Sequence, residues 1–212
     1  MASDAPHVSP YAELEPPEIL AHNLQVGARL AAAAEAFALL AFVFAYLYLR
    51  TLNSNGAWRP KHVDPSAGIG IAMIACLLAC GLAYRDGVRR LGDGTETGWR
   101  RGAIAALVLG LAAFGLIIAQ FVAIDFGPTS GGYASVFIGW QCLYALDLLL
   151  VLYWLETLVA QSLHEHTQAV VPESGDVAAP FAVMRPAGDA LGIVLNLTIA
   201  FGALAFVLLY VI

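Results

Sequence analysis

Long apolar segments alternate with short polar breaks along most of the chain. A helix needs about 20 mainly apolar residues to cross the hydrocarbon core of a bilayer. Five segments meet this requirement, at about 26–49, 67–84, 102–124, 134–160 and 189–212. The pattern therefore predicts an all-α, polytopic integral membrane protein whose membrane domain, residues 26–212, is a bundle of five transmembrane helices.

The composition agrees with a membrane protein and excludes other classes. Of the 212 residues, 60% are hydrophobic and 12% are charged, whereas about 25% of the residues of a soluble domain are charged. The net charge is −6, and the basic residues form one loop cluster rather than a broad face, so we expect no nucleic-acid partner. Residues 1–25 form an acidic, Pro-rich tail without Lys or Arg. This tail lacks the features of a signal peptide and is expected to lie extended at the membrane surface.

The distribution of basic residues predicts the orientation of the bundle. The loop after the second segment holds five of the ten, namely Arg85, Arg89, Arg90, Arg100 and Arg101. Loops rich in Lys and Arg remain in the cytoplasm. The N-terminus is then cytoplasmic, and the C-terminus lies outside.

The positions of histidine and cysteine predict that the chain itself binds no haem or metal. Haem iron in a membrane bundle is usually held by imidazoles that project from the helices. None of the five histidines falls in an apolar segment; His7, His22, His62, His164 and His166 are expected in the tail or the loops. Cys76, Cys80 and Cys142 have no zinc-site spacing, and the alternate spacing of His164 and His166 is a weak metal signal.

Glu35 interrupts the first apolar segment among several alanines. Ionisable groups inside a membrane usually face the bundle interior, and small neighbours let helices approach closely. Glu35 is therefore expected at a helix–helix seam. Two interpretations remain open: a protonated side chain bonded to a backbone carbonyl, or a site that contacts a partner subunit, a lipid headgroup or a proton route.

Asp147 lies near the middle of the fourth segment, between leucines. We expect it to pair with polar side chains at the helix seams, namely Tyr144 on its own helix, Gln120 on the third and Asn196 on the fifth. A polar clasp between helices and a catalytic or transport role both remain open for this residue.

Two stretches resemble a known family. Residues 34–46 carry Glu35 followed by a Phe-rich run, and residues 55–60 read Asn-Gly-Ala-Trp-Arg-Pro, with Trp58 and Pro60. This resembles subunit III of haem–copper oxidases, in which a helix with a membrane-embedded glutamate precedes a loop of the form Gly-x-Trp-Pro-Pro.

The second stretch lies around the third and fourth segments. Gln120 and Asp125 fall where the family has Gln and Glu, and residues 131–137 resemble its entry to the next helix. Two histidines of the family's following motif are replaced here by Tyr144 and Asp147. The short bacterial form of the family also has five spans with the N-terminus inside.

The resemblance implies an accessory, non-redox subunit of a respiratory terminal oxidase in a bacterial or archaeal plasma membrane. Such a subunit is not catalytic alone. Haem and copper lie in the partner subunits, the catalytic subunit I and subunit II, while subunit III holds phospholipid, stabilises the complex and supports proton uptake during oxygen reduction. A subunit III-like partner of a nitric oxide reductase is an alternative within this class. A small proton-coupled transporter that uses Glu35 and Asp147, and an intramembrane lipid-modifying enzyme, are alternatives from other classes.

Overall fold

The computed structural model describes residues 17–53, 58–168 and 181–212. These residues form helices and contain no strand. The helices are α1 (Pro17–Thr51), α2 (Ala67–Gly92), α3 (Glu96–Ala123), α4 (Gly132–Gln168) and α5 (Phe181–Phe206), and α5 ends in the π-helical turn η1 (Val207–Val211). In this part of the chain, five helices are long and apolar enough to cross a membrane. The prediction of an all-α chain with five such helices is confirmed.

The helices extend beyond the apolar segments that predicted them. α1 begins at Pro17, so residues 17–25 are helical and not an extended tail, while residues 1–16 lie outside the described part. Proline fits the first position of a helix, because its missing N–H would be unpaired there in any case. α2 continues past the apolar segment to Gly92, with Arg89 and Arg90 in its last turn. Basic side chains at this end of a helix interact favourably with its unpaired carbonyls.

The longer helices change the placement of three histidines. His22 lies in α1, and His164 and His166 fall within the last turns of α4, so the expectation of tail or loop positions was wrong for these residues. His62 lies in the loop before α2, as expected. The error arose because the apolar pattern marks only the hydrophobic part of each helix, whereas the helical hydrogen bonding continues into the polar residues on either side.

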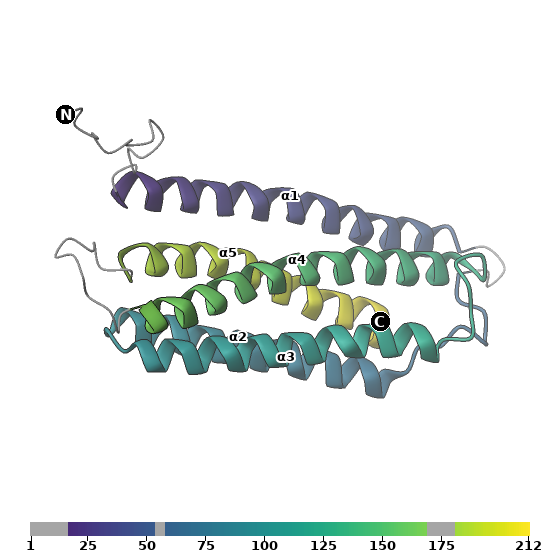
Figure 1. The fold of residues 1–212 in the computed structure, drawn as a ribbon. Helices are drawn as coiled ribbons and strands as arrows, with labels where there is room; N and C mark the ends of the chain where they lie inside the picture. The colour runs from purple at the N-terminus through teal and green to yellow at the C-terminus, as the bar shows by residue number, and fades with distance from the viewer. Residues whose placement is uncertain (1–16, 54–57, 169–180) are drawn as a thin grey trace, which may run out of the picture.

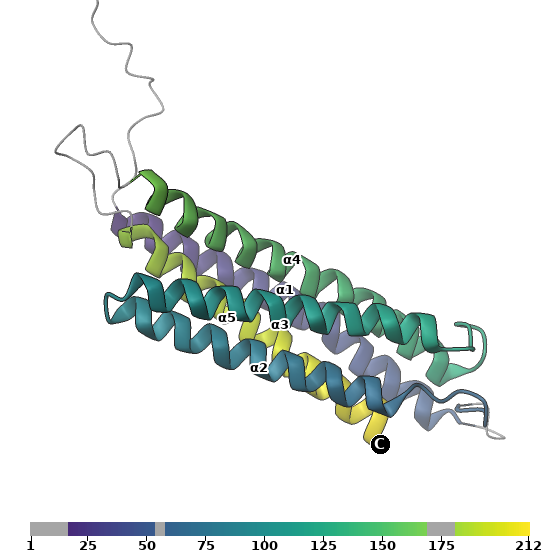
Figure 2. The ribbon, with the colours of Figure 1, turned by 60° about the horizontal axis from the view of Figure 1, so that its bottom comes forward.

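The helices form an elongated bundle with α5 in a central position (Figure 1). α5 contacts α1, α2 and α4, and α1 packs mainly against α4 and α5. α2 and α3 form a hairpin with the most extensive contact between any two helices, and Figure 2 shows them side by side along their length. The peripheral α1 and the α2–α3 hairpin therefore lie on opposite sides of the bundle.

The two ends of the bundle carry different features. α1 and α5 begin at the end that holds the loop between α2 and α3, which we call the Arg-rich end, and Ile212 lies toward the other end (Figure 1). The predicted loop position of the five arginines was wrong, because they lie in the last turns of α2 and the first turns of α3 and the connecting residues 93–95 hold none. The start of α1 shares this end of the bundle with them, as the sequence predicts. The segment 58–66 and the loop before α4 lie at the opposite end.

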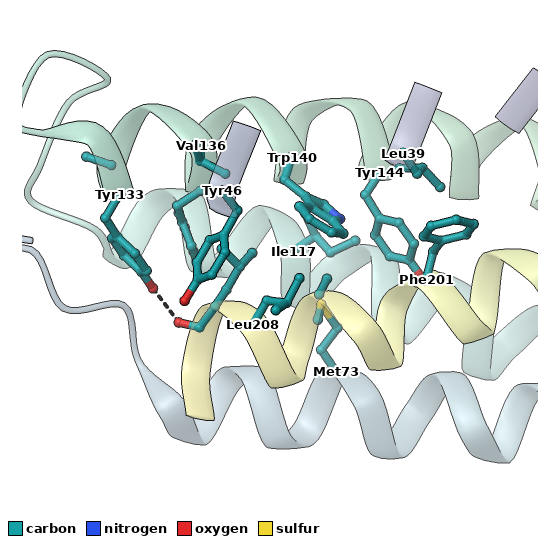
Figure 3. Packing of buried hydrophobic residues seen from close by; sticks show 14 of the residues in the cluster. Leu39, Tyr46, Met73, Ile117, Tyr133, Val136, Trp140, Tyr144, Phe201 and Leu208 are labelled. Carbon is teal, nitrogen blue, oxygen red and sulfur yellow. Dashed lines mark hydrogen bonds between the residues drawn. The ribbon is translucent and has the colours of Figure 1, made fainter. Parts of the chain in front are cut away.

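Side chains of all five helices fill the interior of the bundle. One cluster includes Tyr46, Ile117, Tyr133, Trp140 and Tyr144, all at most 1% exposed (Figure 3). In a membrane this close packing is the main source of helix association, because lipid tails are as apolar as the core side chains.

The α2–α3 hairpin is held by direct backbone contact. A Cβ atom added at Gly102 would lie 2.6 Å from the Cα of Gly87, far closer than any carbon–carbon contact allows. Glycine at both positions lets the two helices approach to this distance, as small residues commonly do in membrane bundles.

Candidate functional site

Two carboxyl groups and one hydroxyl meet near the middle of the bundle. Glu35 of α1, Asp147 of α4 and Thr198 of α5 form this group, which we call the carboxyl cluster. The Thr198 Oγ1 atom is 3.0 Å from Glu35 Oε1 and 3.2 Å from Asp147 Oδ2. Thr198 is fully buried, and the two acidic residues are half-buried. The ionisable residues that the sequence singled out separately therefore belong to one site.

The carboxyl cluster contains more hydrogen-bond acceptors than hydrogen atoms available for donation. The hydroxyl of Thr198 also lies 3.2 Å from the Val194 carbonyl, yet a hydroxyl group has a single hydrogen to donate. Glu35 Oε2 is buried without any hydrogen-bond partner, and no ion pair of the described residues includes either carboxyl group. A proton held by the carboxyl pair would supply the missing hydrogen. Proton binding is thus the chemistry that this arrangement allows.

Tyr144 holds α4 against α5 beside the carboxyl cluster. Its hydroxyl donates to the backbone carbonyl of Thr198 at 2.9 Å, and its ring is almost fully buried (Figure 3). A Cβ at Gly202 would collide with the same hydroxyl. Tyr144 therefore positions Thr198. The sequence had led us to expect a hydrogen bond from Tyr144 to Asp147, but the hydroxyl donates to the Thr198 carbonyl instead.

Gln120 and Asn196 lie elsewhere, so their expected pairing with Asp147 was wrong. The buried amide of Gln120 faces the backbone of Ser66, where it donates to the carbonyl at 3.2 Å and accepts from the N–H at 3.0 Å. This contact satisfies the backbone at the start of α2. Asn196 is exposed and accepts two hydrogen bonds from Arg85.

The sequence signal for Thr198 was present but ambiguous. Asn196 and Thr198 are both polar residues in an apolar segment, two positions apart. Residues with this spacing point to nearly opposite sides of a helix, so only one of them can face a given neighbour. The apolar pattern around them does not decide which one.

A second group of polar and aromatic residues joins α1 to α4 at the end of the bundle opposite the Arg-rich end. We call Tyr46, Trp58, Arg59 and Tyr133 the Trp58 junction. The Trp58 ring packs edge-on against the rings of Tyr46 and Tyr133, with centroids 5.2 Å and 5.9 Å apart. The N–H of Tyr133 donates to the Trp58 carbonyl at 2.9 Å. Edge-to-face aromatic pairs of this kind contribute about 0.5–1.5 kcal/mol beyond their burial.

Arg59 and Pro60 complete the turn that follows Trp58. The guanidinium of Arg59 lies 4.5 Å above the ring of Tyr133 and donates to Asp64 at 2.6 Å. The N–H of Val63 donates to the Pro60 carbonyl at 3.0 Å, so Pro60 lies in a tight turn. The hydroxyl of Tyr133 donates to the Leu209 carbonyl, which ties the junction to the end of α5 (Figure 3).

The cysteines occupy three different environments. Cys80 is fully buried, Cys76 is half-buried and Cys142 is exposed. Within residues 17–53, 58–168 and 181–212, no three His, Cys, Asp or Glu side chains lie close enough together to hold a metal ion. The side chains of His164 and His166 lie outside the described residues.

The comparisons with known proteins leave the family open. No family model matches the chain, and no curated protein matches it either. The resemblance to subunit III consequently remains a prediction from the residues quoted above.

Proposed function

We propose that this chain is an accessory, non-redox subunit of a respiratory terminal oxidase of the haem–copper class. The observation that carries the proposal is the Trp58 junction. The two stretches that resemble subunit III are far apart in the sequence, yet Trp58 of the first contacts Tyr133 of the second by ring packing and by a backbone hydrogen bond. Residues that resemble one family's motifs and also form one contact are better support than either stretch alone.

The surface of α1 suits a subunit that packs on a larger partner. Phe37 is 82% exposed and Phe44 is 69% exposed, and α1 has the smallest buried share of the five membrane-spanning candidates. In a membrane, lipid or the apolar face of another protein can cover these aromatic side chains. In this proposal the catalytic subunit I, with subunit II, provides that cover and carries the haem and copper.

The carboxyl cluster gives the proposed subunit a way to act on its partner. Glu35 is on the exposed helix α1, and its bond to Thr198 links that helix to the bundle centre. A protonatable pair at this position supports proton uptake during oxygen reduction and fixes α1 in its docking position. In this proposal the bundle lies in a bacterial or archaeal plasma membrane, with the Arg-rich end in the cytoplasm.

The first test is purification of the full chain through an affinity tag in a mild detergent. A reduced-minus-oxidised spectrum and the identity of co-purifying proteins are the measurements. We expect haem signals together with a large multi-span partner. A colourless protein that purifies alone from cells with active respiration contradicts the proposal, and a nitric oxide reductase as partner selects the alternative within the same class.

Variants of Glu35 test the role of the carboxyl cluster. Glu35→Ala should weaken assembly of the complex or shorten its lifetime during turnover, because α1 loses its polar bond to α5. The haem spectrum of the assembled complex should not change, since Glu35 is not a metal ligand in this proposal. Glu156→Ala is the matched control, because Glu156 is an exposed acid on α4. An altered haem spectrum in an assembled Glu35 variant contradicts this role.

The carboxyl cluster also favours one function from another class, a small proton-coupled transporter. A pair of carboxyl groups that can bind a proton near the middle of a membrane is typical of such carriers. The purified chain in vesicles would then move protons with its substrate, and Asp147→Asn would abolish that movement. Inactivity of the wild-type chain alone in vesicles excludes this alternative.

A further inference from the structure

A groove with a volume of about 340 Å³ lies between α2 and α5. Its polar lining comes from Arg85 and Arg89 of α2 and from Asp189 and Asn196 of α5. The rest of the lining is mainly apolar and includes Gly192. Arg85 and Asn196 are both exposed, so their polar groups are open to whatever covers this side of the bundle.

Asn196 holds the guanidinium of Arg85 close to the middle of the spanning region. The Nε and Nη2 atoms of Arg85 donate to Asn196 Oδ1 at 3.1 Å and 2.7 Å. The candidate span that contains Asn196 runs from Met184 to Val211. Asn196 lies 12 residues after its start and 15 residues before its end, which corresponds to about 18 Å and about 22 Å along the helix.

A guanidinium at this depth is out of reach of lipid phosphates. The hydrocarbon core is about 30 Å thick, and about 40–45 Å with the headgroup layers, so phosphates lie roughly 15–20 Å from its centre. Arginine side chains near helix ends usually extend to the interface. Arg85 extends inward instead, because α2 runs toward the Arg-rich end (Figure 1) and side chains lean toward the N-terminus of their helix. Hydrocarbon cannot solvate this cation, so it requires an anionic partner at the same depth.

The described part of the chain does not supply that partner. Arg85 forms no ion pair with another described residue. Asp189 lies seven residues before Asn196, about 10 Å nearer the Arg-rich end. Two acids of the described helices lie near mid-span, Glu35 and Asp147, and both are engaged in the carboxyl cluster inside the bundle. A second copy of these helices would therefore offer no exposed acid at the level of Arg85.

We propose that the groove between α2 and α5 docks a membrane-spanning helix of a partner protein, and that an Asp or Glu near the middle of this helix pairs with Arg85. Asn196 takes two N–H donors of the guanidinium, and the remaining donors suit a carboxylate. Because Asn196 Oδ1 already accepts from Arg85, the amide N–H groups of Asn196 are further donors. Gly192 in the lining lets the backbone of another helix approach closely.

This contact is separate from the exposed face of α1, and it does not depend on the identity of the partner complex. Failure of the oxidase proposal would leave the pairing of Arg85 with a helix carboxylate unaffected. Conversely, a groove that binds no acidic helix would leave the co-purification test of the oxidase proposal intact.

The test uses the full chain in dioleoyl phosphatidylcholine vesicles with a synthetic Leu-rich peptide of about 20 residues, long enough to span the bilayer. The peptide carries one Asp at its centre and a dansyl group at one end. Energy transfer from tryptophan to dansyl measures binding, and Trp99 lies beside Gly188 of the groove lining. We expect the Asp peptide to bind about fivefold more tightly than a peptide with Asn at its centre, the effect of one polar contact between membrane helices.

Variants of the full chain locate the binding site of the peptide. Arg85→Gln should abolish the preference for Asp, whereas Arg85→Lys keeps the charge and should retain part of it. Asn196→Ala releases Arg85 toward the interface and should weaken the preference, which keeps the test valid if Arg85→Gln does not fold. Arg101→Gln removes an equal charge outside the groove and should leave the preference unchanged. Circular dichroism verifies the helix content of each variant.

Four outcomes overturn the proposal. Equal binding of the Asp and Asn peptides by the wild type means that the groove does not select a carboxylate. A preference for Asp that persists in Arg85→Gln means that the peptide binds elsewhere. Loss of the preference in vesicles of dioleoyl phosphatidylglycerol assigns the groove to lipid headgroups. Self-association of the chain that Arg85→Gln removes assigns the groove to a second copy.

Discussion

Replacing Gly102 by alanine should drive α2 and α3 apart, because the backbone of α2 occupies the place of the new Cβ. That atom would lie 2.6 Å from Gly87 Cα, 2.8 Å from Gly87 N and 2.9 Å from Ala83 O. Carbon atoms pack best at about 3.5–4.0 Å, so the helices would have to separate by roughly 1 Å. All three obstructing atoms are backbone atoms, and no side-chain rotation can relieve the collision.

The size of the effect follows from this displacement. A radial gap of about 0.5–1 Å removes about a quarter to a half of the attraction between facing atoms. The α2–α3 contact is the most extensive in the bundle, so we expect a loss near the upper end of the usual overpacking range, about 2–3 kcal/mol. Gly115→Ala is the matched control on the same helix, because a Cβ at Gly115 meets no atom within 4 Å. Both variants share the same gain in helix propensity, up to about 1 kcal/mol.

The assay is unfolding by SDS in mixed micelles, followed by far-UV circular dichroism and tryptophan fluorescence. Trp99 is fully buried beside the Gly87–Gly102 contact and reports its opening. Gly102→Ala should unfold at a lower SDS fraction than the wild type, and Gly115→Ala at an equal or higher fraction. Equal unfolding midpoints for the two alanine variants would refute the reasoning.

Three further predictions concern other parts of the bundle. Thr198→Val removes the hydroxyl group that contacts both carboxyl groups and should lower the free energy of unfolding by about 1–2 kcal/mol in the same assay. Thr198→Ser keeps the hydroxyl and should remain close to the wild type. A valine variant as stable as the wild type would contradict this expectation. Trp58→Ala removes the centre of the Trp58 junction and should lower the free energy of unfolding by about 3 kcal/mol. It should also make the following segment, residues 59–66, easier to cleave with trypsin, and cleavage at the wild-type rate would contradict the role of the junction. A membrane-permeant maleimide should label the exposed Cys142 in the folded protein and the buried Cys80 only after unfolding. Equal labelling rates for the two cysteines in the folded protein would show that Cys80 is not buried.

The number and type of helices could be predicted because each apolar segment is long enough to cross a membrane. Their ends could not. α1 begins at Pro17 and α2 continues to Gly92, since polar and charged residues at helix ends can remain helical in the interfacial region. Hydropathy reports where the hydrocarbon ends, and the backbone hydrogen bonding that defines the helix extends further.

The members of the carboxyl cluster were only partly predictable. Glu35 and Asp147 stand out because ionisable residues are costly in apolar segments. Their meeting depends on how α1 and α4 are rotated about their axes, and this rotation is set by packing throughout the bundle. Thr198 was missed in favour of Asn196, because a two-residue step on one helix separates the interior from the lipid side.

At the Trp58 junction, too, the local turn could be predicted from the sequence and the contact between distant residues could not. The turn at Pro60 follows from local sequence, and the structure has it. The contact between Trp58 and Tyr133 joins residues on different elements, and no periodicity within either stretch encodes it. Only the complete arrangement of α1 and α4 brings the two rings together.

The central position of α5 has a consequence for the biogenesis of the protein. The α2–α3 hairpin joins two helices that are adjacent in the chain, so it can form as soon as both have been synthesised. α1 emerges first but has its main partners in α4 and α5, which are synthesised last. If the helices are inserted in chain order, α1 is expected to remain without its main partners until α4 and α5 follow, and Glu35 then lacks its hydrogen bond to Thr198. The carboxyl cluster can form only when α5 has joined α1 and α4.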